Sequence, residues 1–250
     1  MSQAERPADI GRVWSAVRFN PMVDAVIFDF DGVIADTEPL HYRAFREVLR
    51  GRGIDLSQAE YFAKYVGLND ATLLRRILED RGLPLSDADA LRAQKDAAYE
   101  QLIAQGLELL PGVREFVENA SVRRLLAICS GARRSEIQAI LRQHELERYF
   151  SAVVSTEDVP ISKPDPAGFL RALELLRERL PSLRAEQCVV VEDSLLGIQA
   201  ARSAGMHVLA VLGPKNHPSR IIGDRRAAEA DWICENLDGL RVEQLDASGE

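Results

Sequence analysis

Two aspartates, Asp29 and Asp31, stand at the end of an apolar run that begins at Val23, and Gly32 follows them directly. A buried strand gains nothing from such an ending, because an unpaired carboxylate is costly to bury. Two carboxylates at a strand end make sense if a cation or a reacting phosphate lies beside them. The spacing therefore predicts a site of this kind at the end of the strand.

Three further polar groups follow apolar runs later in the chain. They are Ser130 with Gly131, Lys163 within Ile-Ser-Lys-Pro-Asp-Pro, and Glu192 with Asp193. Taken alone, each has an ordinary structural explanation as a turn, a helix cap or a solvated lysine. Taken with the aspartates, all of them fall at or just beyond the carboxyl ends of expected parallel strands. This is the edge at which open α/β sheets bind ligands.

The elements that must position these groups alternate between apolar runs and helical patterns from about residue 111 onward. Such alternation predicts an α/β fold with a doubly wound parallel sheet and a Rossmann-like core. The expected strands are Val23–Phe28, Arg124–Ser130, Ala152–Ser155, Cys188–Glu192, His207–Leu212 and, more weakly, Asp231–Cys234. The expected helices cover about residues 112–120, 133–143, 166–179 and 195–204.

Residues 39–108 have a different pattern, with four helical segments and no convincing strand. Apolar residues recur there at helical spacing, glycines punctuate the segment ends, and Ser57–Glu60 has the spacing of a capping box. The sequence thus predicts an α-helical cap domain, residues 39–108, inserted into an α/β core of residues 21–38 and 109–250. Residues 1–20 form an N-terminal extension, in which Val13, Trp14, Val17 and Phe19 suggest a short packing helix.

Composition limits the function classes. The chain has 250 residues and a formal net charge of −8, which argues against non-specific nucleic-acid binding. Its longest apolar runs are far too short to span a membrane, and residues 1–20 lack the features of a signal peptide. The three cysteines are widely spaced and favour buried thiols over disulfides or zinc ligands. A cytoplasmic protein is therefore expected.

The motifs resemble those of the haloacid dehalogenase superfamily, in the branch that carries a helical cap after the first strand and includes β-phosphoglucomutase and related phosphatases. Asp-Phe-Asp-Gly-Val resembles the first motif, Ser130 the second, Lys163 the third and Glu192-Asp193 the fourth. The stretch Glu-Asp-Ser-Leu-Leu-Gly-Ile-Gln-Ala-Ala-Arg-Ser-Ala-Gly-Met is typical of this branch. The resemblance covers about residues 22–240.

The resemblance implies a role for each motif residue. Asp29 would be the nucleophile that forms an aspartyl-phosphate, and Asp31 the general acid and then the general base. Mg²⁺ would be held by the carboxylates of Asp29 and Asp193, by the main-chain carbonyl of Asp31, and by Glu192 as a ligand or a neighbour. Phosphate oxygens would be held by Ser130 and nearby backbone N–H groups, including that of Gly131. Lys163 would stabilise the transferring phosphoryl group.

The same resemblance narrows the reaction. A dehalogenase needs neither a magnesium cluster nor a carboxylic acid for an alcohol leaving group, and a phosphonatase would have another residue at position 31. The intact pair Asp29 and Asp31 therefore implies phosphoryl transfer.

Four residues bear on the choice between a phosphatase and a β-phosphoglucomutase. His41 falls on the hinge histidine of the mutase and Lys95 on a cap lysine, which many phosphatases share; His41 could equally be a packing residue. Within residues 66–70 the mutase has an arginine that grips a second phosphate, whereas this chain has Asn69. The absence of that guanidinium counts against a mutase, although Arg133 can partly compensate for the lost phosphate contact.

The expected function is a Mg²⁺-dependent phosphatase that hydrolyses a small organic phosphate, such as a sugar or related metabolite phosphate, through an aspartyl-phosphate. A β-phosphoglucomutase-like isomerase is the alternative, and a non-catalytic binding protein on this scaffold is a third. The expected partner is a small phosphorylated metabolite, with no nucleic acid and no membrane, and the expected state is a monomer or weak homodimer.

Overall fold

The computed structural model describes residues 14–15, 22–65, 68–213 and 229–246. The chain divides into two compact units, which we describe separately. Residues Met1–Ala35 and Leu109–Glu250 form the α/β unit, and residues Asp36–Glu108 form the helical unit.

The α/β unit is built on a seven-stranded sheet with the order β1-β7-β6-β5-β2-β3-β4. Strands β2 to β7 run parallel to one another, so their carboxyl ends share one edge. Strand β2 is central, between β3 and β5, and carries the first aspartate at its end. The expected doubly wound parallel sheet is confirmed. The strands are β2 (Ala25–Phe28), β3 (Leu125–Cys129), β4 (Ala152–Val154), β5 (Cys188–Glu192), β6 (His207–Val211) and β7 (Trp232–Cys234).

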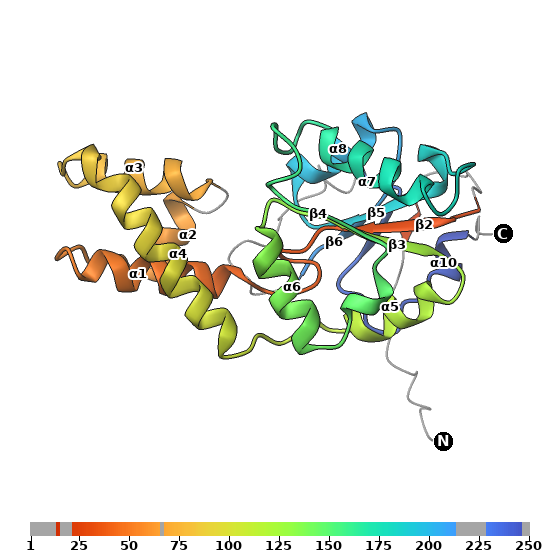
Figure 1. Cartoon of the computed structure of the whole chain (residues 1–250), viewed down its shortest axis with the longest axis horizontal. Coiled ribbons are helices and arrows are strands. Elements are labelled where there is room, and N and C mark those ends of the chain that lie inside the picture. Colours follow the sequence, from red (N-terminus) through yellow and green to blue (C-terminus); the bar gives the residue numbers. More distant parts are fainter. Residues whose placement is uncertain (1–13, 16–21, 66–67, 214–228, 247–250) are drawn as a thin grey trace, which may run out of the picture. The chain divides into compact units, whose positions relative to one another are not determined.

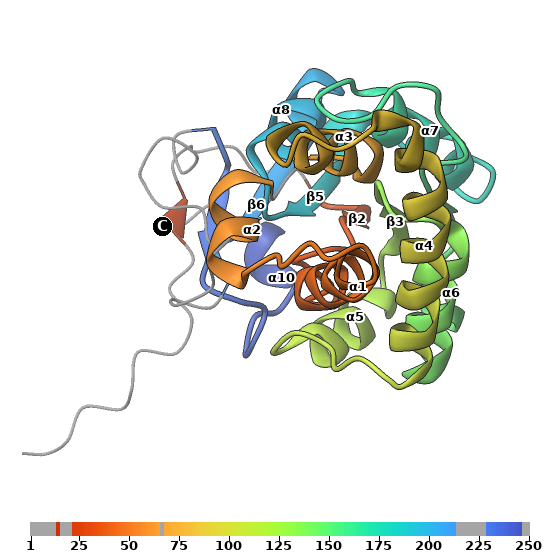
Figure 2. The same ribbon diagram turned by 90° about the vertical axis from the view of Figure 1, so that its left-hand side faces the viewer.

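Helices cover both faces of this sheet. Figures 1 and 2 show α7 and α8 along one face and α5 along the other. On the first face, small and branched side chains of the strands pack against Phe169 of α7 and Ile198 of α8. On the other face, the Phe28 ring meets the edges of Phe116 and Phe150 at centroid distances of 5.9 and 5.8 Å. The helices are α5 (Val113–Ser121), α6 (Arg134–Gln143), α7 (Ala167–Arg177), α8 (Leu195–Ser203) and α10 (Glu243–Asp246).

The expected packing helix near the N-terminus is wrong where the structure describes it. Trp14 and Ser15 form strand β1, which pairs antiparallel with β7 at the edge of the sheet. The pairing partners lie more than two hundred residues away in the sequence, so the local spacing of apolar residues could not reveal this strand. The remaining residues of the expected helix lie outside the described residues.

The helical unit consists of four α-helices and one short 3₁₀ turn among its described residues. Its core contains Phe45 and Leu49 of α1, Tyr61 of α2, Leu74 of α3 and Leu91 of α4. Ser57 is the N-cap of helix α2, and its side chain accepts the Glu60 N–H, as the capping pattern predicts. No described helix is long and apolar enough to cross a membrane. The bounds are α1 (Glu38–Arg50), α2 (Gln58–Lys64), α3 (Asp70–Asp80) and α4 (Ala88–Ala104).

The points at which the chain leaves and re-enters the α/β unit lie side by side. Ala35 pairs with Leu109 in an antiparallel bridge, and the Leu110 N–H donates to the Ile34 carbonyl at 3.0 Å. Ala35 also bridges Asp31, and its carbonyl accepts the Gly32 N–H at 2.9 Å. The loop that carries the second aspartate is therefore fixed by backbone hydrogen bonds within the α/β unit.

Cys129, Cys188 and Cys234 are free and buried, as expected from their spacing. Burial raises the pKa of each thiol to about 12, so all three are protonated at neutral pH.

Candidate active site

Asp29 is the first residue after the central strand β2, and it is buried. Its N–H donates to the Val191 carbonyl of β5 at 2.9 Å, which extends the β2–β5 ladder by one more residue. The neighbouring strand β5 ends at Glu192, with Asp193 next in the chain. The parallel register therefore brings the ends of β2 and β5 together, as the sequence predicts.

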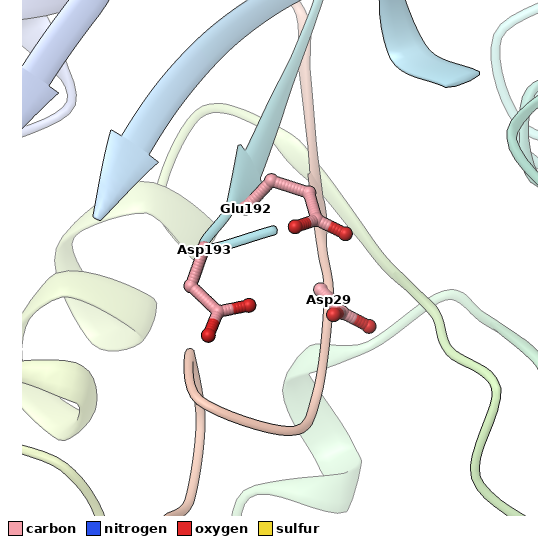
Figure 3. Close-up of side chains that lie close together, drawn as sticks. All are labelled: Asp29, Glu192 and Asp193. Atoms are coloured by element: carbon pink, nitrogen blue, oxygen red, sulfur yellow. The ribbon is translucent and has the colours of Figure 1, made fainter. Parts of the chain in front are cut away.

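Three carboxylates meet at this point (Figure 3). Asp29, Glu192 and Asp193 each contribute one oxygen, and these oxygens all lie within 4.8 Å of one another. Glu192 is completely buried and Asp29 nearly so, whereas Asp193 is half-buried. Carboxylate oxygens at such distances are suited to a hard divalent cation.

Lys163 supplies the positive charge of this group. Its Nζ lies 2.9 Å from Asp29 Oδ1 and 2.6 Å from Glu192 Oε1, so one ammonium bridges two of the three carboxylates. Burial by itself lowers the pKa of Lys163, but the Asp29 and Glu192 carboxylates together outweigh it and hold the pKa above its usual value. Lys163 is therefore a permanent cation beside the buried aspartate.

One lysine does not balance the acidic group. Burial, together with Glu192 and Asp31, raises the pKa of Asp29 to about 8 against the attraction of Lys163. Burial and the neighbouring Glu192 and Asp29 also raise the pKa of Asp193 well above its ordinary value. A divalent cation would remove this repulsion, and the oxygen-rich donor set fits it.

This electrostatic imbalance predicts a pH-dependent response to the cation. The folded-state pKa of Asp29 is above that of an unfolded aspartate, so its contribution to stability is present below about pH 4 and is lost as pH rises through about 8. A bound Mg²⁺ would supply the missing positive charge, so the rise in Tm on adding Mg²⁺ should be small near pH 5 and large near pH 8. Thermal unfolding with Mg²⁺ or EDTA measures this, and an equal rise at both pH values would contradict it.

The expected phosphate-binding residues also come together. A recess of about 100 Å³ is lined by Ser130, Gly131 and Lys163 among other residues. Ser130 directly follows β3; its Oγ accepts the Ala132 N–H at 3.0 Å and lies 3.4 Å from Asp31 Oδ2. The structure thus places a hydroxyl beside the second aspartate and a lysine beside the first.

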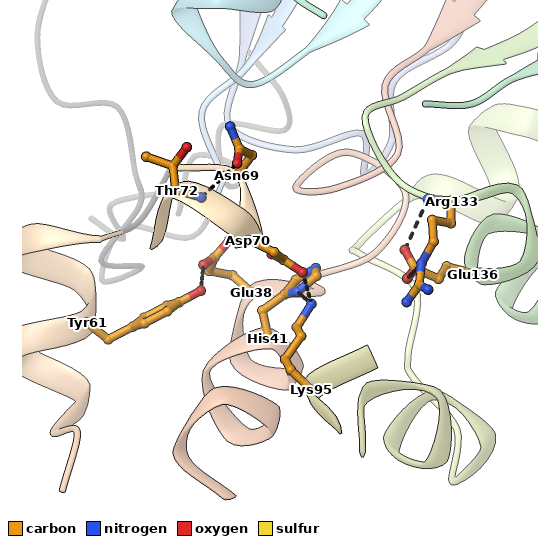
Figure 4. A network of polar contacts seen from close by, with 9 residues as sticks. All are labelled: Glu38, His41, Tyr61, Asn69, Asp70, Thr72, Lys95, Arg133 and Glu136. Carbon is orange, nitrogen blue, oxygen red and sulfur yellow. Dashed lines mark hydrogen bonds and ion pairs between the residues drawn. The ribbon is translucent and has the colours of Figure 1, made fainter. Parts of the chain in front are cut away.

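Two of the residues assigned to substrate binding form one cluster inside the helical unit (Figure 4). The buried Lys95 Nζ lies 2.5 Å from Asp70 Oδ2 and 2.9 Å from His41 Nδ1. An ammonium can only donate, so Nδ1 of His41 accepts and the proton of the neutral ring is on Nε2. The Tyr99 ring stacks on His41 at 4.1 Å and lies 4.6 Å from Lys95 Nζ.

The other two assigned residues have local structural partners. Asn69 is the N-cap of α3, and its side chain accepts the Thr72 N–H at 3.0 Å. In the α/β unit, Arg133 precedes α6 and bonds to Glu136 in its first turn. The Arg133 Nε donates to Glu136 Oε1 at 2.8 Å, and the Arg133 backbone N–H donates to Glu136 Oε2 at 3.1 Å. Capping explains why asparagine is favoured at position 69, so its residue type alone says little about substrate.

A family model described as haloacid dehalogenase-like hydrolase matches residues 23–205. The chain belongs to this family. The match spans the central strand with Asp29, the Ser130 and Lys163 loops, and the Glu192-Asp193 pair.

Named relatives of this haloacid dehalogenase-like hydrolase include phosphatases. The chain is 36% identical to the phosphorylated carbohydrates phosphatase of Thermotoga maritima, over 74% of this chain and 82% of the relative. It is also 36% identical to the fructose-1-phosphate phosphatase YqaB of Escherichia coli, over 74% of this chain and 95% of that relative. Among solved structures, the putative β-phosphoglucomutase of Thermotoga maritima has a TM-score of 0.67 and 31% identity, covering 84% of this chain and 92% of that one.

Some partners in this hydrolase were not predicted from the sequence. Asp70 pairs with Lys95 across 25 positions, and no local pattern marks that contact. The pairing of Arg133 with the buried Glu136 could have been found, because an N-cap residue and a glutamate three positions later have the spacing of a capping box. Glu192 was expected beside the cation, but its ion pair with Lys163 was not.

Proposed function

We propose that this haloacid dehalogenase-like hydrolase is a Mg²⁺-dependent phosphatase of small sugar phosphates or related metabolite phosphates. The observation that carries the proposal is the buried Asp29, which pairs with Lys163 and lies beside the carboxylates of Glu192 and Asp193. The names of the two phosphatase relatives support the substrate class.

In this mechanism, an oxygen of the Asp29 carboxylate attacks phosphorus and the bond from phosphorus to the substrate oxygen breaks. Asp31 gives its proton to that oxygen, so the product leaves as a neutral alcohol. Asp31 then takes a proton from water, which attacks the aspartyl-phosphate and frees inorganic phosphate and Asp29. Each residue returns to its starting state after one hydrolysis.

The remaining residues of the site act on charge and position. Lys163 stabilises the charge on Asp29 and on the phosphoryl oxygens, and Ser130 and the Gly131 N–H hold those oxygens. Asp29, Glu192 and Asp193, with the main-chain carbonyl of Asp31, would hold Mg²⁺. When bound, Mg²⁺ supplies the charge neutralisation that lets carboxylates and a phosphate dianion share one site.

We propose that side chains of the helical unit select the substrate. His41 would contact the substrate from the position in which the bond between its Nδ1 and Lys95 holds the ring. Asp70 balances the charge of Lys95, which suits an uncharged sugar hydroxyl better than a second phosphate. Asn69 and Arg133 are further proposed substrate contacts, and each of them also has a structural partner.

A β-phosphoglucomutase-like isomerase is the second candidate. It is favoured by the similarity to the putative β-phosphoglucomutase of Thermotoga maritima. Lys95 is compatible with either activity, because many phosphatases share the cap lysine that it resembles, whereas His41 resembles the hinge histidine of the mutase.

A substrate panel separates the two functions. The purified protein is incubated with Mg²⁺ and with sugar, nucleotide and small-acid phosphates, and free phosphate is measured. One further reaction contains β-glucose 1-phosphate with a bisphosphate primer. Selective phosphate release from a sugar phosphate is the expected result. Glucose 6-phosphate appearing with little free phosphate would favour the mutase.

A further inference from the structure

Glu192 is held at both carboxylate oxygens. Its Oε1 receives Lys163 Nζ at 2.6 Å, and its Oε2 accepts the Ser194 N–H at 2.6 Å. The residue is fully buried at the end of β5, so its carboxylate cannot move without losing one of these bonds inside the protein. The position of this side chain is therefore fixed by its surroundings.

Gly197 leaves the space that this carboxylate occupies. It lies in the first turn of α8, where the Ser194 side chain caps its N–H at 3.0 Å. A Cβ atom on Gly197 would lie 2.6 Å from Glu192 Oε2 and closer still to Oε1. Both distances are well inside van der Waals contact, and alanine is otherwise the better helix former at such a position.

Gly32 does the same for the neighbouring carboxylate. A Cβ atom on Gly32 would lie 2.7 Å from Asp193 Cγ and closer still to Oδ2. Gly32 also has a φ of +77°, which glycine adopts without strain. Two glycines, one in the loop after β2 and one in α8, thus border the two adjacent acidic side chains.

We propose that Gly32 and Gly197 are positioning residues of the cation site, because their missing side chains leave room for the Asp193 and Glu192 carboxylates. A methyl group at either position would push one carboxylate out of the group formed with Asp29. The inference rests on the proposed cation site and goes beyond it, because neither glycine supplies a ligand.

The first test is the cation affinity of Gly197→Ala, measured by calorimetric titration with Mg²⁺ in the absence of substrate. Gly51→Ala is the matched control, since its Cβ would meet only the Val48 carbonyl oxygen, at 3.3 Å. Binding should weaken at least tenfold in Gly197→Ala and less than twofold in Gly51→Ala. Unchanged binding by a folded Gly197→Ala protein would overturn the proposal.

The second test separates backbone strain from lost space. Gly205 has a φ of +75°, close to that of Gly32, but its Cβ would lie 3.6 Å from the nearest atom. Gly32→Ala and Gly205→Ala therefore share the strain, and only Gly32→Ala is expected to lose Mg²⁺ affinity tenfold or more. Equal losses in the two variants would overturn the assignment of Gly32, and this pair remains informative if Gly197→Ala does not fold.

A double-mutant cycle tests the mechanism itself. Glu192→Asp shortens the side chain by one methylene, so it makes room for the new methyl group in Gly197→Ala. The shortening should cost Mg²⁺ affinity in the parent protein and cost several-fold less, or restore affinity, in the Gly197→Ala background. Additive effects would contradict the proposal. If the parent binds Mg²⁺ but hydrolyses no phosphate ester, the proposed function fails and the glycine proposal is still decided by these titrations.

Discussion

Replacing Asp29 by asparagine should lower phosphate release at least about 10⁴-fold, equivalent to about 5.5 kcal/mol of lost transition-state stabilisation. The amide has the size of the carboxylate but cannot attack phosphorus, so the covalent step is removed and the geometry is kept. Initial rates with the best substrate of the panel measure the effect. Mass spectrometry after a rapid acid quench should find one phosphoryl group on the parent protein and none on the variant.

Asp24→Asn is the control for this substitution. Asp24 directly precedes β2, at the opposite end of the strand from Asp29, and its carboxylate accepts the Gln187 side-chain amide. This variant should keep most of the activity. The Asp29→Asn protein should also be more stable than the parent near pH 8 without a cation, because it no longer buries a charge whose pKa is raised to about 8. An Asp29→Asn protein with a tenth of the parent activity would exclude Asp29 as the nucleophile.

Replacing Asp31 by alanine should slow the hydrolysis of alkyl phosphates by about 10² to 10⁴-fold, the usual range for loss of a general acid or base. With p-nitrophenyl phosphate, phosphoryl transfer to Asp29 should be slowed far less, because nitrophenolate leaves without a proton. The second step still lacks its base. The variant should therefore release a burst of about one nitrophenol per active site and then turn over slowly.

Stopped-flow absorbance with the aryl substrate, beside steady-state rates with the alkyl substrate, tests both roles of Asp31 in one variant. The comparison of two leaving groups is an internal control for damage to the fold, which would slow both substrates alike. Equal losses for both substrates without a burst would show that Asp31 serves the structure of its loop, where it bridges Ala35, and transfers no proton.

Much of the α/β unit could be predicted because its signals are local. Each central strand is a short apolar run, and β5 was predicted with the bounds that the structure has, Cys188–Glu192. The convergence of Asp29, Lys163 and Glu192 follows from topology, because parallel strands end at the same edge of the sheet. The residue types at that edge by themselves indicate acidic, cation-binding chemistry.

Contacts between distant segments could not be predicted. The edge pairing of β1 with β7 and the ion pair of Lys95 with Asp70 depend on tertiary packing, and neither has a periodic signature. Asn69 shows a different difficulty. Its chemistry suits both a substrate contact and a helix cap, and only the hydrogen bond to the Thr72 N–H identified the cap.

The paired backbone segments at Ala35 and Leu109 have an evolutionary consequence. They hold the two ends of the insertion together, so the pairing of the strands in the sheet does not depend on the length of the intervening chain. Even for a flexible connection, each doubling in length costs only about 0.6 kcal/mol in closure entropy. The insertion can therefore be lengthened, shortened or replaced during evolution while the sheet and the carboxylate group at its edge stay unchanged.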